Sequence, residues 1–123
     1  MANDDTTIRS PVRQPFVLYA ANGRIYARNR TQKVIDLGAL TREDGGSFRY
    51  LLDGNQQSDG GFFTEEEALH AIARSIRFLW LDGQFTAVAD ARDDAGLNLD
   101  GATRITIELD EMPPGERAVD ATV

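Results

Sequence analysis

The stretch that decides the fold is residues 16–29, FVLYAANGRIYARN, in which two short runs flank Asn22–Gly23. Asparagine followed by glycine is the strongest short-range signal for a β-hairpin, because both residues tolerate the positive φ that a type I′ turn requires. A two-residue loop also fixes the register of the two strands, so Tyr19 is predicted to face Tyr26. The sequence therefore predicts a tight hairpin at this point of the chain.

The two faces of this hairpin differ in chemistry. One face is uniformly apolar and is predicted to meet the core; its members are Phe16, Leu18, Ala20, Ile25 and Ala27. The other, here called the Tyr/Arg face, carries Tyr19, Arg24, Tyr26 and Arg28, with Arg30 added if the second strand runs on. Aromatic rings stack on bases and guanidinium groups contact phosphates, so this face is the candidate binding site. Two alternatives are that its pairs only stabilise the hairpin, and that a second hairpin covers it.

The clearest helix start in the chain lies at Thr64. Its side chain can cap the first turn while Glu67 reaches back to the Thr64 amide, which is the capping-box arrangement. Phe63 and Ala68 occupy the positions of a hydrophobic staple, and apolar residues then recur at helical spacing. With a stop signal at Asp82–Gly83, this pattern predicts one amphipathic helix.

The remaining apolar segments are predicted strands. They occupy residues 34–40, 48–52, 85–91 and 103–109, and residues 53–61 form a polar loop. Together they predict a single α+β domain over residues 16–110, with the order β-β-β-β-α-β-β and one amphipathic helix laid across an antiparallel sheet. The polar, proline-containing ends, residues 1–15 and 111–123, are predicted to be flexible, disordered tails.

Composition limits the classes of function. The chain has 123 residues, enough for one core, and no cysteine, which removes disulfides, thiolate metal sites and thiol nucleophiles. No apolar leader follows the first residues, and no apolar run approaches the roughly 18 residues of a membrane span. We therefore expect a cytoplasmic protein that does not enter a membrane.

Residues able to carry catalysis are few. The single histidine, His70, has Glu66 and Arg74 one helical turn away, which describes a solvated helix face better than a general base with its orienting partner. No nucleophile motif accompanies it. The prediction is a non-enzymatic protein with no catalytic residues.

Metal and phosphate sites are also weakly indicated. The loop at residues 90–100 is rich in the oxygen ligands that Ca²⁺ prefers, but its glycines do not have EF-hand spacing. An ordinary acidic connection is therefore favoured, with an irregular cation site as the alternative. The pairs Gly45–Gly46 and Gly60–Gly61 lack the spacing and the lysine of a P-loop. No metal or cofactor is predicted.

One local resemblance concerns DNA. Residues 60–68, GGFFTEEEA, with Ala71, are similar to the strand-to-helix junction of AP2/ERF and phage-integrase arm-binding domains. The resemblance implies a sheet that enters a DNA major groove with a helix behind it, and it would lend a DNA-contact role to Arg24, Arg28 and Arg30. It covers about a dozen residues. The strand tryptophans of these domains are missing, since the only tryptophan is Trp80, and the extra strands and the acidic second half also depart from the pattern.

Charge is unevenly spread along the chain. Residues 61–123 hold five bases and thirteen acids, a net charge of −8, whereas residues 16–60 hold six bases and five acids. An acidic half that meets a basic partner favours a small non-enzymatic protein-interaction or regulatory module, which in an extreme version imitates nucleic acid. The alternative is a nucleic-acid-binding domain that uses the Tyr/Arg face. The partner, the pathway and the oligomeric state are left open.

Overall fold

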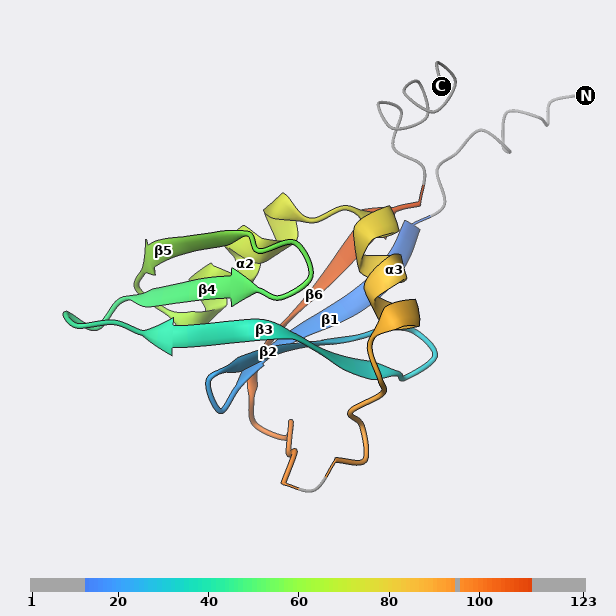
Figure 1. Ribbon diagram of the computed structural model, residues 1–123, viewed down its shortest axis with the longest axis horizontal. Helices are drawn as coiled ribbons and strands as arrows, with labels where there is room; N and C mark the ends of the chain where they lie inside the picture. The colour runs from blue at the N-terminus through green and yellow to red at the C-terminus, as the bar shows by residue number, and fades with distance from the viewer. Residues whose placement is uncertain (1–12, 95, 112–123) are drawn as a thin grey trace, which may run out of the picture.

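The computed structural model describes residues 13–94 and 96–111 (Figure 1). Their fold is a curled, six-stranded antiparallel sheet with two helices, which confirms the α+β class. The strands are β1 (Arg13–Ala21), β2 (Arg24–Arg28), β3 (Val34–Arg42), β4 (Phe48–Leu52), β5 (Ser58–Phe62) and β6 (Thr103–Asp110), and the helices are α2 (Glu65–Ser75) and α3 (Phe78–Ala87). In the sheet the strand order is β5-β4-β3-β2-β1-β6.

The predicted hairpin forms β1 and β2. Tyr19 pairs with Tyr26 as expected, and Asn22 and Gly23 both have positive φ, 53° and 77°. β1 begins earlier than predicted, because residues 13–15, assigned to the N-terminal tail from the sequence, pair with β6. The other tail predictions, for residues 1–12 and 112–123, lie outside the described residues.

The single predicted helix is in fact two helices. Ile76 and Arg77 are both extended, with ψ of 155° and 161°, and they separate α2 from α3. α3 then continues through Gly83, the predicted stop, and into the predicted strand at residues 85–91. The reason is burial: the break turns α3 so that Phe78 and Phe85 both pack on Phe16, with ring centroids 6.2 and 5.8 Å apart.

A second correction concerns the predicted loop at residues 53–61. Its last part is the edge strand β5, which pairs with β4 and places Phe62 opposite Phe48. The ring of Phe62 stacks on Tyr50 with centroids 6.0 Å apart. β5 is polar and contains two glycines, so its strand character comes from backbone pairing and not from its composition. The real order is therefore five strands, two helices and one strand.

The core lies between one face of the sheet and the two helices. All five residues of the apolar hairpin face are buried there, namely Phe16, Leu18, Ala20, Ile25 and Ala27. α2 contributes Leu69 and Ile72, and α3 contributes Leu81. Neither described helix has the length and apolar character needed to cross a lipid bilayer. Because α2 and α3 fill one face, the Tyr/Arg face of the hairpin lies on the other side of the sheet.

Candidate functional site

The structure places four of the five predicted site residues on one sheet face. Tyr19 comes from β1, and Arg24, Tyr26 and Arg28 come from β2, at alternate positions opposite the buried apolar set. Arg30 does not join them on a strand, because β2 ends at Arg28 and Arg30 is exposed in the following turn. The alternation of residue types therefore identified the face correctly, but the conditional extension to Arg30 does not hold.

Tyr19 is fully buried although it points away from the main core. Its exposed fraction is 0%, and the guanidinium carbons of Arg28 and Arg104 lie 5.5 and 5.0 Å from its ring centroid. Arg104 comes from β6, which pairs with β1 so that Arg104 is opposite Tyr19. Among the described residues, the buried Tyr19 hydroxyl has no hydrogen-bond partner. This ring is therefore already occupied by cations and is not open to a stacking base.

Arg24 is held by carboxylates. Its Nη2 atom donates to Asp36 Oδ1 and to Asp53 Oδ2, each at 2.9 Å. The hydrogen bond with Asp36 is the main cause of a raised pKa for Arg24. Burial, followed by the charge of Asp36, raises the pKa of Tyr26. A phosphate approaching Arg24 would have to compete with two carboxylates already in place.

The loop that follows α3 folds back over the Tyr/Arg face, so the covering element is this loop and not a second hairpin. Asp90 anchors it: Oδ1 accepts hydrogen bonds from the amides of Val34 and Arg92, at 3.2 and 2.9 Å. These amides, that of Arg92 first, hold the pKa of Asp90 below its ordinary value. Further along, Arg104 Nη2 donates to the Leu99 carbonyl at 2.7 Å. One acid of the loop, Asp90, thus serves as a backbone anchor.

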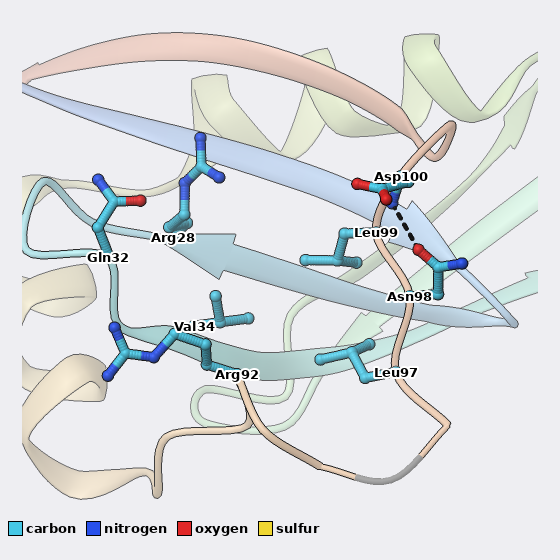
Figure 2. Close-up of a pocket in the computed structure, with 8 residues that line it drawn as sticks. All are labelled: Arg28, Gln32, Val34, Arg92, Leu97, Asn98, Leu99 and Asp100. Atoms are coloured by element: carbon cyan, nitrogen blue, oxygen red, sulfur yellow. Dashed lines mark hydrogen bonds between the residues drawn. The ribbon is translucent and has the colours of Figure 1, made fainter.

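Between this loop and the sheet lies a pocket of about 290 Å³, here called the loop pocket. It is lined by Arg28, Gln32, Val34, Arg92, Leu97, Asn98, Leu99 and Asp100. Figure 2 shows Leu97 and Leu99 reaching from the loop toward Val34, with Gln32 and Arg92 at one end of the pocket and Asn98 and Asp100 at the other. Of these residues only Arg28 belongs to the predicted site. The sequence did not predict the others as pocket residues, because no local pattern indicates that this loop packs against a strand far away in the chain.

A second hollow, of about 350 Å³, lies at the start of α2 and is here called the Phe63 groove. It is lined by Arg42, Phe48, Phe63, Thr64, Glu65, Glu66 and Thr103. Thr64 caps the helix as predicted, accepting the Glu67 amide at 3.0 Å. The Glu67 carboxylate, however, accepts the amide of Phe63 and not that of Thr64. The Phe63 side chain is 81% exposed and forms no staple.

The remaining candidates from the sequence are His70, a metal site and the junction that resembles AP2/ERF domains. His70 is exposed on α2, with its Nε2 atom 3.7 Å from Glu66 Oε2. Across residues 13–94 and 96–111, no group of three or more histidine or acidic side chains is arranged to hold a metal ion. The strand-to-helix junction that resembles AP2/ERF domains is present, since β5 ends at Phe62 and α2 begins at Glu65, but the sheet has six strands and not three.

Comparisons with protein-family models, curated proteins and solved structures found no match to this chain. Its function must therefore be argued from the chemistry of its own surfaces.

Proposed function

We propose that this chain is a non-enzymatic protein-interaction module whose contact surface is the Phe63 groove. Phe63 carries the proposal. Its backbone amide is fixed by Glu67, at 2.9 Å, yet its ring is 81% exposed. An aromatic side chain exposed to water contributes little to the fold, and aromatic residues are enriched at protein interfaces.

The chemistry of the groove suggests the kind of partner. Phe48 and Phe63 provide the apolar surface, and the one lining base, Arg42, already lies over the Phe48 ring at 5.7 Å. Glu65 and Glu66 add two carboxylates to the rim. A segment with an apolar side chain next to a lysine or arginine complements this combination. The proposal thus refines the expectation of an acidic surface that meets a basic partner.

Two features support a role without catalysis. The only histidine of the chain, His70, is an exposed helix residue beside Glu66, and the sequence contains no cysteine.

The test compares two exposed apolar residues. Full-length chain carrying Phe63→Ser is used beside the control Leu79→Ser, because Leu79 is 48% exposed on α3, away from the groove. Proteins captured by the wild type are identified, purified and titrated by calorimetry. We expect a partner whose Kd rises at least about tenfold with Phe63→Ser and is unchanged with Leu79→Ser. Equal affinity of both variants for every captured protein would refute the proposal.

Nucleic-acid binding through the Tyr/Arg face is the second candidate. It is favoured by Arg28 and by the exposed Arg30 in the turn that follows β2. Neither forms a salt bridge with a carboxylate of the described residues. Labelled single- and double-stranded DNA and RNA are titrated by fluorescence anisotropy at about 50 and 200 mM salt. Salt-sensitive binding that Arg28→Glu/Arg30→Glu abolishes and Arg74→Glu/Arg77→Glu preserves would establish this second candidate. No binding at the lower salt would dismiss it.

A further inference from the structure

We propose that the loop pocket binds a small organic anion that has an apolar body. Arg28 and Arg92 would receive its acidic group, and Leu97, Leu99 and Val34 would receive its body. This inference does not depend on the Phe63 groove, which lies at the start of α2 and shares no residue with the loop pocket.

The apolar part of the pocket is contributed by two distant segments. Val34 is buried at the beginning of β3, and the half-buried Leu97 and Leu99 extend toward it from the loop (Figure 2). Ligand sites are typically apolar cavities with a few placed polar groups, from about 300 Å³ upward. At about 290 Å³, the loop pocket is at the lower end of that range. It therefore suits a molecule the size of a single substituted ring.

The basic end supplies more donors than the protein uses. Arg28 has no salt bridge with a described carboxylate and is oriented by its position over Tyr19. Arg92 pairs through Nη2 with Asp90 Oδ2 at 3.0 Å, which leaves most of its five N–H donors available. Of the two guanidinium groups, only that of Arg92 is paired with a described carboxylate. A bound carboxylate or phosphate would accept their remaining hydrogen bonds, which are the strong, charge-assisted kind.

Gln32 adds an amide at the same end. Its backbone has a φ of 72°, which is uncommon for glutamine. The conformation is maintained by the turn around Asn29, whose carbonyl accepts the Gln32 amide at 2.9 Å and whose side chain accepts the Lys33 amide, also at 2.9 Å. The turn thereby places Gln32 at the rim of the pocket, beside Arg28 (Figure 2).

The opposite end sets the orientation of the ligand. Asp100 lies there beside Asn98, whose Oδ1 atom accepts the Asp100 amide at 2.9 Å (Figure 2). A carboxylate at this end repels a second anionic group, so a molecule with one acidic end is favoured over a diacid. The loop pocket is therefore polarised along its length, with an apolar middle.

The experiment is a ¹H–¹⁵N NMR titration of the full chain with matched probes. 3-Phenylpropionate and phenyl phosphate carry the two kinds of acid, 3-phenylpropanol and 3-phenylpropylamine replace the acid, and inorganic phosphate lacks the apolar body. We expect at least one aromatic acid to shift the amides of Val34, Leu97 and Leu99, with a Kd of about 1 mM. The alcohol, the amine and inorganic phosphate should bind at least about tenfold more weakly. The acid that binds more tightly shows whether the pocket prefers a carboxylate or a phosphate.

Variants test the assignment of residues. Arg92→Gln should weaken binding of the preferred acid about tenfold, whereas Arg74→Gln, an exposed arginine of α2, should leave it unchanged. The proposal is overturned if no acid binds up to about 20 mM, if the alcohol or inorganic phosphate binds as tightly as the aromatic acid, or if the shifted amides lie elsewhere. Should Arg92→Gln not fold, the comparison of acid with alcohol on the wild-type chain decides.

Discussion

Tyr19 shows how one side chain on the far face of the sheet is stabilised. Its ring lies under the guanidinium groups of Arg28 and Arg104, one from each neighbouring strand. Such contacts contribute about 0.5–1 kcal/mol when exposed and about 2 kcal/mol when water is excluded. The buried hydroxyl, which has no partner in the described part of the chain, works in the opposite direction, because an unpaired hydroxyl in the interior costs about 1–3 kcal/mol.

Removing that hydroxyl should not harm the protein. Tyr19→Phe keeps the ring and both cation contacts, so we expect the free energy of unfolding to be unchanged or to rise by up to about 1 kcal/mol. Tyr19→Leu keeps an apolar side chain but loses the ring, and it should lower the free energy of unfolding by about 1–2 kcal/mol. Urea unfolding of the three proteins measures both changes. A loss greater than about 1 kcal/mol in Tyr19→Phe would show that the hydroxyl does have a partner in solution.

At the scale of elements, the boundary between α2 and α3 is decided by packing. Ile76 is buried at the break, and Phe78 opens a helix that has no side-chain cap. Local signals favour a different boundary, since Asp82–Gly83 has the form of a helix stop. The aromatic contacts of Phe78 and Phe85 with Phe16 outweigh the roughly 1 kcal/mol that a glycine costs inside a helix.

Gly83→Ala distinguishes these two boundaries. Gly83 lies inside α3, and an added Cβ would meet nothing within 4 Å. We therefore expect Gly83→Ala to raise the free energy of unfolding by roughly 0.5–1 kcal/mol, because alanine favours the helix and restricts the unfolded chain. A glycine that ended the helix with positive φ would give destabilisation instead. Thermal unfolding followed by circular dichroism separates the two, with Gly45→Ala as the control at a positive φ of 92°.

At the scale of the whole molecule, a base near the start of the described chain pairs with an acid of the acidic second half. Arg13 in β1 donates through Nε to Asp110 in β6 at 2.9 Å, across 97 residues of sequence. Arg24 is shared by Asp36 and Asp53. These pairs are partly exposed, so each contributes little to stability. Arg13 does neutralise one acid of residues 61–123 within the fold. Asp36 and Asp53, in contrast, belong to the same part of the chain as Arg24.

The stability that Asp90 contributes by anchoring the loop to the sheet should depend on pH. The folded-state pKa of this carboxyl is lowered from 3.8, first by the Arg92 amide. A depressed folded pKa gives a contribution that is fully present above the unfolded pKa and is lost as the pH falls through the folded value. We therefore expect Asp90→Asn to lower the unfolding midpoint at pH 6, and the gap to the wild type to close as the pH falls through the lowered folded-state pKa of Asp90.

Urea unfolding of both proteins between about pH 2.5 and 7 tests this linkage. Asp93→Asn is the matched control, because Asp93 is an exposed acid of the same loop that accepts none of the anchoring hydrogen bonds. A gap between Asp90→Asn and the wild type that stayed constant over this range would mean that the charge of Asp90 does not anchor the loop.

The sequence by itself determined the elements whose signals are short-range. Asn22–Gly23 specified the turn, and alternation on either side of it identified both the core face and the Tyr/Arg face. Thr64 marked the start of α2. These features follow from backbone preference and side-chain periodicity within about ten residues, which any single sequence displays.

Only the tertiary structure decided the strand character of β5, the break at Ile76, the exposure of Phe63 and the cover over Tyr19. α3 depends on the ring of Phe16, and the loop depends on the hydrogen bond from the distant Val34 amide to Asp90. β5 depends on backbone pairing with the neighbouring strand β4. Their energies come from surfaces that meet only after the chain has collapsed. The loop pocket has the same origin, because its arginines and its leucines come from segments that no local pattern joins.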